Sequence, residues 1–396
     1  TPEATSASLY CKSLASDIVF SPKYSKKSAK ERLRIGYLSY DFHDHATLHL
    51  LSGVLRLHDK KRFKIYAYSY GFPSESIYRK NARKYVDVFR DIRLTSDLGV
   101  AEIINKDKID ILVDLKGHTS GCRLGILALK PAPISVTWLG FPGTTGADYV
   151  DYILTDKVVT PPNEAKYYSE KIVYLPHTYQ PTDNKQSISD RKYSPANLGL
   201  PGDPDTFIFS SFNQTHKIEP EAFDVWMRIL KKVPKSVLWL WVDSDIAANN
   251  LKKEVKKRGI DTSRLVFAGP LPKEMHLKRL SFSDLALDTF TYNGHTTTSD
   301  CLWAGVPVVT LKGNHFASRV SASLLTAIGL PELITHSPKE YEELAINLGR
   351  NPKKLNAIRY SLLAKRLTEP LFDTQRFTND LEEVYEDIWK NNNKKS

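Results

Sequence analysis

The chain has 396 residues, of which 41% are hydrophobic, 26% charged and 11% aromatic. This length exceeds one ordinary hydrophobic core, which excludes a single small binding module and predicts two compact lobes, and the apolar content excludes a disordered or fibrous protein. Lysine and arginine outnumber aspartate and glutamate by 56 to 45, so the net charge of +11 favours an anionic partner without identifying the anion.

The sequence contains no apolar run that could cross a bilayer. The longest run, residues 236–242, ends at Asp243 and is far shorter than the roughly 18 residues that a membrane span requires. The cysteines lack metal-binding or disulfide spacing, so we expect a cytoplasmic protein, or a nuclear one as well in a eukaryote. The first residue is Thr1 and no signal segment follows, so we expect the chain to be part of a longer protein.

The first part of the chain predicts one α/β lobe. Residues 1–30 are expected to form an N-terminal extension. From residue 31 to residue 182, short apolar runs alternate with segments of helical length, which is typical of a parallel sheet with crossover helices. The expected strands of this lobe are 33–39, 63–69, 109–114, 134–139 and 152–155.

The second part repeats this alternation after a polar stretch, 183–205, that is expected to be a linker. The second lobe is expected over residues 206–373, and residues 374–396 are expected to form a C-terminal closing helix and tail, because apolar residues recur there on one helical face. The predicted fold is α/β, with two doubly wound Rossmann-like lobes facing a central ligand cleft. The expected strands of the second lobe are 207–212, 236–242, 265–268, 285–288 and 306–311.

The densest group of polar residues follows the expected strand 285–288. Gly294 lets the backbone approach a ligand, and the hydroxyl and N–H groups of Thr296–Thr298 are predicted to form an anion site at a helix N-terminus. The alternative is that these threonines only cap the helix. Asp300, one turn further on, is a candidate acceptor for ribose hydroxyls.

Two more loops at strand ends carry cations. Lys217 follows the strand 207–212, where its ammonium could bind a phosphate, although a solvated surface lysine is the alternative. Lys273 and His276 follow the strand 265–268 and add a cation and an imidazole.

Three histidines follow the first expected strand within seven residues: His43, His45 and His49. A metal site is not expected, because no further Cys, Glu or His cluster completes a zinc ligand set. We interpret one of these histidines as facing the cleft, where it bonds a sugar hydroxyl or an acceptor, and His49 as a structural residue of the following helix. The glycine-rich loop 139–146 lacks the Gly-Lys-Ser/Thr ending of a phosphate-binding loop.

Several motifs in the same order resemble the catalytic region of the protein O-GlcNAc transferases, whose family includes Spindly-type protein O-fucosyltransferases and bacterial homologues. The resemblance covers about residues 33–389. It implies a GT-B fold, a UDP-GlcNAc donor held mainly by the second lobe, no cofactor or metal, and inverting transfer to serine or threonine of proteins. The motifs are Leu139–Gly146, Tyr174–Thr178, Phe212–Gln214, Lys217–Ile218, Pro272–Glu274 with His276, and Asn293–Thr297 with Asp300.

The resemblance also implies site residues, carried over position by position. The donor-binding residues are Gln214, Lys217, Lys273, His276, His295, Thr296, Thr297 and Asp300. Gln214 corresponds to a uracil contact and Lys217 to a phosphate contact. Lys273 and His276 correspond to uridine contacts. Residues 295–297 correspond to diphosphate contacts, and Asp300 corresponds to the ribose acceptor. Catalytic roles are implied for His45, Lys217 and His118. Lys217 and the helix start would stabilise charge on the departing diphosphate.

Three other functions stay open at this point. Transfer of fucose from GDP-fucose is the alternative within the enzyme class, and His295 favours GlcNAc. A non-catalytic binding protein on the same fold is the second alternative. A nucleic-acid-binding protein is the third, based on the basic cluster 252–258, which we interpret as a solvated helix face because no aromatic residues interleave it. The expected partners are a UDP-sugar and protein acceptors with serine or threonine, and neither nucleic acid nor a membrane span is expected.

Overall fold

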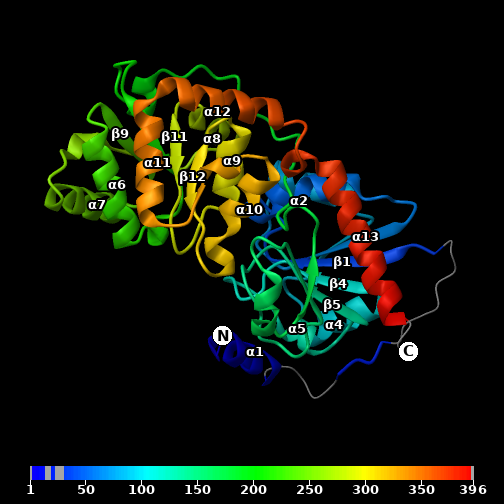
Figure 1. The fold of residues 1–396 in the computed structure, drawn as a ribbon. Helices are drawn as coiled ribbons and strands as arrows, with labels where there is room; N and C mark the ends of the chain where they lie inside the picture. The colour runs from blue at the N-terminus through cyan, green and yellow to red at the C-terminus, as the bar shows by residue number, and fades with distance from the viewer. Residues whose placement is uncertain (1, 14–18, 23–30, 394–396) are drawn as a thin grey trace. The chain divides into compact units, whose positions relative to one another are not determined.

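The computed structural model describes residues 2–13, 19–22 and 31–393 (Figure 1). Parts of the expected extension 1–30 and of the expected tail lie outside the described residues. The chain folds into two compact units: unit 1 comprises Thr1–Asn184 with Asp373–Ser396, and unit 2 comprises Lys185–Phe372. No helix in the described part of the chain is long and apolar enough to cross a membrane.

Unit 1 contains, within the described residues, a parallel sheet with the strand order β3-β2-β1-β4-β5-β6-β7. Its strands are β1 (Leu33–Ser39), β2 (Phe63–Ser69), β3 (Val88–Asp91), β4 (Ile111–Asp114), β5 (Ile134–Thr137), β6 (Tyr152–Thr155) and β7 (Lys171–Tyr174). The central strands β1 and β4 are almost fully buried, as expected for parallel strands that helices cover on both faces.

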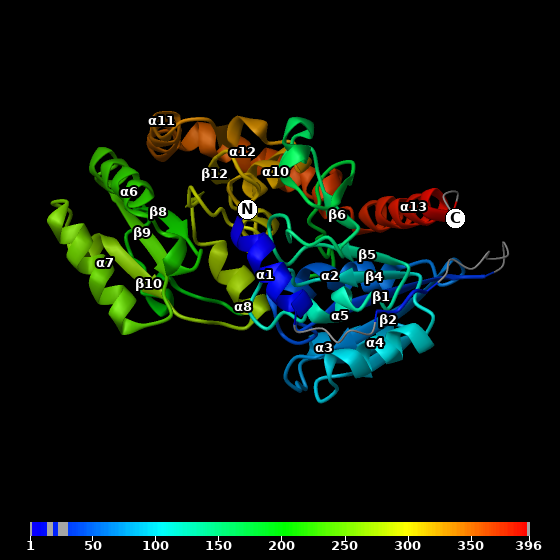
Figure 2. The same ribbon diagram turned by 90° about the horizontal axis from the view of Figure 1, so that it is seen from below.

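Helices lie on both faces of this sheet. They are α1 (Pro2–Ser13), α2 (Ala46–Leu57), α3 (Ile77–Tyr85), α4 (Asp97–Lys106), α5 (Gly125–Ala128) and α13 (Thr374–Asn393). The strand order and the right-handed crossover rule place α2 and α3 on one face and α4 and α5 on the other. The contacts agree, because α2 touches α3 and α13, whereas α5 touches α4 and α1 (Figure 2).

Unit 2 is built on a second parallel sheet, with the strand order β10-β9-β8-β11-β12-β13. Its strands are β8 (Phe207–Ser211), β9 (Ser236–Trp241), β10 (Leu265–Ala268), β11 (Leu285–Leu287), β12 (Val308–Leu311) and β13 (Ile334–Thr335). Its helices are α6 (Pro220–Lys232), α7 (Asp245–Lys257), α8 (Lys273–Leu280), α9 (Thr296–Trp303), α10 (Val320–Ala327), α11 (Pro338–Arg350) and α12 (Pro352–Lys365).

The packing of α6 shows why these segments become helices in unit 2. Phe223, Trp226 and Leu230 recur at helical spacing and are buried. Glu221 and Lys231 of the same helix are exposed. This apolar face lets α6 cover the sheet, and α11 lies beside it in unit 2 (Figure 1).

Each sheet has one point where the strand order reverses. In unit 1 the reversal lies between β1 and β4, and in unit 2 it lies between β8 and β11. In open parallel sheets, ligands bind beyond the carboxyl ends of the strands at such a point. We therefore expect ligand-binding residues in the loops that follow β1, β4, β8 and β11.

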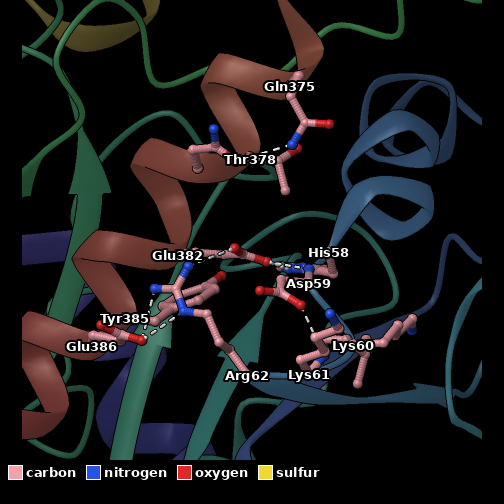
Figure 3. Close-up of polar contacts among 12 residues, drawn as sticks. His58, Asp59, Lys60, Lys61, Arg62, Gln375, Thr378, Glu382, Tyr385 and Glu386 are labelled. Carbon is pink, nitrogen blue, oxygen red and sulfur yellow. Dashed lines mark hydrogen bonds and ion pairs between the residues drawn. The ribbon is translucent and has the colours of Figure 1, made fainter.

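The C-terminal helix α13 returns to unit 1 and is fastened there by a buried polar network (Figure 3). The Glu382 carboxylate is 2% exposed and accepts hydrogen bonds from His58 Nδ1 at 2.9 Å and from the Asp59 N–H at 2.8 Å. On the other side of the His58 ring, Nε2 lies 2.9 Å from the Tyr37 hydroxyl, which lies 3.2 Å from the Tyr385 hydroxyl. The helix thus docks through buried polar groups as well as through its apolar face.

Three strands of the structure were not predicted from the sequence. β3, β7 and β13 are edge strands, and none of them carries the continuous buried run that marks a central strand. The expected strands 109–114 and 306–311 begin two residues later than expected, at Ile111 and Val308. Of the stretch expected as a linker, residues 185–205 are grouped with unit 2.

Candidate functional site

The loop after β8 carries the first group of candidate residues. Asn213 is buried directly after the strand. A short 3-10 helix, η3 (Thr215–Lys217), follows it, and Gln214 is exposed at the start of this turn. Lys217 ends the turn and is partly buried. The strand end therefore directs Asn213 inward and leaves Gln214 accessible.

Lys217 is held by the loop that follows β11. Its ammonium donates a hydrogen bond to the carbonyl of Asn293 at 3.1 Å and lies 3.8 Å from the centre of the Tyr292 ring. Burial lowers the pKa of Lys217 to about 8, and the nearby carboxylate of Asp288 opposes this decrease. The geometry is that of a desolvated cation with defined contacts, unlike that of a solvated surface lysine.

Asp288 organises the loop after β11, although no motif in the sequence marks it as a functional residue. Its Oδ1 accepts hydrogen bonds from Asn213 Nδ2 at 3.0 Å, from the Thr289 N–H at 2.9 Å and from the Gly294 N–H at 2.6 Å. Its Oδ2 accepts one from the Thr310 hydroxyl at 2.7 Å. Burial raises the pKa of this carboxyl, and the hydrogen bonds oppose the increase. These donors fix the path of the loop.

The helix α9 begins where this loop ends. His295 is the residue at its N-cap, and the His295 side chain makes no capping hydrogen bond. Thr296–Thr298 form the first helical turn, so they do not serve as a simple cap. A Cβ atom on Gly294 would lie 2.4 Å from the Thr298 hydroxyl oxygen. Only glycine fits there, and the N–H groups of the first turn lack intrahelical partners and can bind an anion.

Side chains around the start of α9 hold it in place. The Thr297 hydroxyl donates to Asn213 Oδ1 at 2.5 Å, and the Ser321 hydroxyl donates to the Gly294 carbonyl at 2.9 Å. His295 Nε2 is buried and has no hydrogen-bond partner in the described part of the chain. Burial, together with the nearby Lys217, lowers the pKa of His295 well below its ordinary value, so this ring is neutral at pH 7.

A second polar group lies one turn further along α9. Asp300 Oδ1 lies 2.5 Å from Lys273 Nζ, and Asp300 Oδ2 lies 3.9 Å from His276 Nε2. Arg279 donates to His276 Nδ1 at 3.0 Å, so the proton of a neutral His276 ring lies on Nε2 and faces the carboxylate. The structure thus brings together the candidate residues Lys273, His276 and Asp300.

In unit 1, His45 precedes α2. Its Nδ1 accepts a hydrogen bond from the Thr47 N–H at 3.2 Å. Asp41 Oδ2 lies 3.5 Å from the same nitrogen and accepts a hydrogen bond from Lys116 Nζ at 2.9 Å. Burial lowers the pKa of His45, Lys116 and His43 act in the same direction, and Asp41 opposes them. Because Nδ1 is an acceptor, the neutral ring carries its proton on Nε2 and presents a donor there.

His118 lies in the loop after β4, the strand that neighbours β1. Its Nε2 lies 2.6 Å from the Thr145 carbonyl, which makes this nitrogen the donor. The hydroxyl of Ser8 on α1 donates to the same carbonyl at 2.6 Å, and the Phe141 ring packs edge-on against the imidazole. The two candidate histidines of unit 1 therefore both follow central strands.

His49 and Asp114 are two further titratable residues of unit 1. His49 lies 2.7 Å from Asp44 and packs on the Tyr78 ring, which fits the structural role expected for it. In the described residues, no group of three or more His, Cys, Asp and Glu side chains could hold a metal ion. Asp114, at the end of β4, was not singled out from the sequence; burial raises its pKa to about 7.

The profile of Glycosyl transferase family 41 matches residues 13–194 and 186–381. The probable UDP-N-acetylglucosamine–peptide N-acetylglucosaminyltransferase SEC of Arabidopsis thaliana is 41% identical over 365 residues, and the corresponding enzyme of Caenorhabditis elegans is 30% identical over 470 residues. Each alignment covers 91% of this chain but only 37% and 41% of those relatives, respectively.

Solved structures agree with the fold. The structure of an O-GlcNAc transferase variant from Thermobaculum terrenum superposes with a TM-score of 0.89 at 32% identity, covering 98% of this chain and 73% of that one. Anabaena HepE, solved with UDP and glucose, shares the fold with a TM-score of 0.60 at 12% identity, covering 90% of this chain and 100% of that one. The expected fold class is confirmed, and the chain belongs to glycosyl transferase family 41, with the two parallel α/β sheets of the GT-B architecture.

Proposed function

We propose that this chain transfers N-acetylglucosamine from UDP-GlcNAc to serine and threonine hydroxyls of proteins, with inversion at the sugar and without a metal. The proposal is supported by membership of family 41 and by relatives named as UDP-N-acetylglucosamine–peptide N-acetylglucosaminyltransferases. The chain spans less than half the length of those relatives, so the proposal concerns the chemistry of this region.

The observation that carries the proposal is the pairing of Lys217 with the start of α9. When the bond between the sugar and the diphosphate breaks, negative charge develops on the departing phosphate oxygen. The desolvated ammonium of Lys217 and the N–H groups at Thr296 and Thr297 offer donors for that charge in one loop system. A cation and a helix N-terminus together perform the task that a divalent metal performs in other transferases.

The rest of the donor is assigned to the neighbouring residues. We assign the uracil to exposed Gln214, the uridine to Lys273 and His276, and the ribose hydroxyls to Asp300. We also assign His295 to the diphosphate. Because the neutral ring donates its one N–H to the Ala317 backbone, the buried Nε2 can donate to a phosphate oxygen only when the ring takes up a proton beside the anion. Gln214 and Asp300 follow β8 and β11, the strands at the switch point of the unit 2 sheet, and Lys273 and His276 of α8 lie next to Asp300.

The acceptor side is assigned to unit 1. His45 and His118 lie in the loops that follow the neighbouring strands β1 and β4. Because His45 accepts the Thr47 N–H through Nδ1, its Nε2–H would donate a hydrogen bond to the sugar or to the acceptor hydroxyl. We therefore give His45 an orienting role in the transfer step.

A transfer assay tests the proposal. The protein is incubated with serine- and threonine-containing peptides and either UDP-GlcNAc or GDP-fucose, with and without EDTA, and products are identified by mass spectrometry. We expect GlcNAc transfer that EDTA leaves intact and that Lys217→Met lowers about 10²- to 10³-fold. The control is Lys253→Met on the exposed face of α7, which should retain full activity.

The outcomes separate the alternatives. Transfer of fucose alone would replace the proposed donor, and loss of transfer in EDTA would contradict the metal-independent mechanism. A protein that binds UDP but neither transfers the sugar nor hydrolyses UDP-GlcNAc without an acceptor would be a binding protein on the GT-B fold.

A further inference from the structure

Two short segments of unit 2 are fastened to each other beside the anion site. Glu219 accepts the N–H of Thr291 at 2.8 Å through one carboxylate oxygen and the Thr291 hydroxyl through the other. Lys217 donates to the Asn293 carbonyl at 3.1 Å, and its ammonium lies over the ring of Tyr292. The loop between β11 and α9 is thus tied at three consecutive residues to the segment that carries Lys217.

The contact between Lys217 and Tyr292 is the closest of the contacts between a cation and an aromatic ring in the described residues. Nζ lies 3.8 Å from the ring centre, whereas other lysines lie more than 5 Å from theirs. The electron-rich ring face attracts a cation, and this attraction is strongest where water is excluded. Burial also raises the pKa of the Tyr292 hydroxyl, so the ring remains neutral beside the ammonium.

The geometry leaves one donor of Lys217 for a ligand. A protonated lysine has three N–H groups. One is directed to the Asn293 carbonyl and one toward the Tyr292 ring face, which leaves the third for an anionic oxygen. The Tyr292 ring also lies 5.0 Å from the His295 ring, the residue that begins α9. Tyr292 therefore lies close to both the cation and the residue at the start of the helix.

We propose that Tyr292 is a positioning residue whose ring face holds the Lys217 ammonium in the orientation that binds the donor diphosphate. The ring replaces part of the hydration that Lys217 loses on burial and prevents the long side chain from sampling other rotamers. This inference rests on the proposed function, because the diphosphate of a nucleotide sugar is the anion that Lys217 would meet.

The test compares two ligands that differ only in their phosphates. The dissociation constants of UDP and uridine are measured by calorimetry at pH 7 for the parent chain, Tyr292→Phe and Tyr292→Leu. The ratio of the uridine constant to the UDP constant reports the contribution of the diphosphate. We expect Tyr292→Leu to lower this ratio roughly 5- to 30-fold and Tyr292→Phe, which keeps the ring face, to leave it within about twofold.

A double variant shows whether Tyr292 acts through Lys217. In a Lys217→Met background, Tyr292→Leu should cause no further change in the ratio, because there is no ammonium left to position. Tyr167→Leu is the matched control: its ring also faces a lysine, Lys166 at 5.1 Å, but it is 66% exposed and lies in unit 1. This control should keep the parent ratio.

Structural damage and positioning give different results. A damaged fold weakens uridine and UDP alike and lowers the melting temperature, which leaves the ratio unchanged and overturns the inference. An equal effect of Tyr292→Leu with and without Lys217, or a Tyr292→Phe ratio as low as that of Tyr292→Leu, also overturns it. A parent chain that binds UDP with the expected ratios but transfers no sugar overturns the proposed function alone, and a chain that does not bind UDP overturns both.

Discussion

Lys273 and Asp300 form a buried ion pair in unit 2, with Nζ 2.5 Å from Oδ1 and side-chain exposures of 9% and 6%. A buried charge is tolerated when its partner is present and is costly when the partner is removed. The pair therefore links donor binding to stability, because the two groups that we assign to uridine and ribose also neutralise each other.

This ion pair predicts that each single variant is less stable to unfolding than the double variant. Lys273→Met or Asp300→Asn should each destabilise the protein by roughly 3 kcal/mol, since each leaves one buried charge unpaired. The double variant should recover part of that loss. Urea unfolding measures the effect, with the exposed pair Lys235 and Asp203 as the control whose removal should not move the midpoint. Additive single effects would contradict the coupling.

Lys217 should reduce stability while it serves binding. Its pKa in the folded chain is about 8, below its ordinary value of 10.5. The unfolded chain therefore binds this proton more tightly than the folded chain. The contribution of Lys217 to the free energy of unfolding is fully present above about pH 10.5 and is lost as pH falls through 8. At pH 7 we expect Lys217→Met to be more stable by roughly 1 to 2 kcal/mol, after allowing for the lost ring contact.

Thermal unfolding at several pH values checks this. The gain of Lys217→Met over the parent should be constant below pH 8 and should shrink between pH 8 and 10.5. Lys253→Met, at an exposed position of α7, should show no gain at any pH. A Lys217→Met chain that is less stable than the parent at pH 7 would show that the buried ammonium is fully compensated.

Gly294 tests the close packing at the start of α9. A Cβ atom there would lie 2.4 Å from the Thr298 hydroxyl oxygen, 2.7 Å from that of Thr297 and 3.1 Å from Asn213 Oδ1. Gly294→Ala must therefore displace the first turn, and we expect UDP affinity to fall at least about 10-fold. At Gly202 a Cβ would meet no atom within 4 Å, so Gly202→Ala is the matched control and should bind UDP normally.

Much of this architecture could be predicted from the sequence. The alternation of apolar runs with helical segments identified the central strands of both sheets, because strands covered on both faces are apolar throughout. The loop residues at Lys217 and Thr296 could be placed beyond strand ends for the same reason. The edge strand β3 could not be predicted, since its residues 88–91 are only partly buried and lack that pattern.

The contacts that shape the candidate site could not be predicted in the same way. Asp288 directly follows the apolar strand β11, and the donors that bond to it come from Asn213 and Thr310 as well as from its own loop. Tyr292 meets Lys217 only because β8 and β11 are neighbours in the sheet. Such pairs are far apart in sequence, and no periodicity links them. Glu382 carries a charge and breaks the apolar pattern of α13, yet it is buried against His58.

The buried His58 should make the docking of α13 sensitive to acid. Burial lowers the pKa of His58, with hydrogen bonding to Glu382 opposing the decrease. A histidine with a lowered pKa contributes stability that is present above the unfolded pKa near 6.5 and is lost as pH falls. We expect the parent to lose stability more steeply between pH 6.5 and 5 than His58→Gln, whose amide offers a donor and an acceptor in place of the ring.

The slope for one proton cannot exceed about 1.4 kcal/mol per pH unit. Unfolding in urea at half-unit pH steps gives the comparison. His336 is exposed, so His336→Gln should keep the parent slope. Identical slopes for the parent and His58→Gln would mean that protonation of His58 does not cause the loss of stability in acid.

His45 carries two tasks that can be separated by substitution. Its Nδ1 accepts the Thr47 N–H and so caps α2, and its Nε2–H is the group that we assign to the sugar or acceptor. His45→Ala loses both, so it should lower transfer about 10²- to 10⁴-fold and stability by about 1 kcal/mol. His45→Asn keeps a good cap, so it should restore the melting temperature while transfer stays low. In both variants UDP affinity should stay near that of the parent, because the donor residues belong to unit 2. Transfer that recovers together with the melting temperature in His45→Asn would make His45 a structural residue.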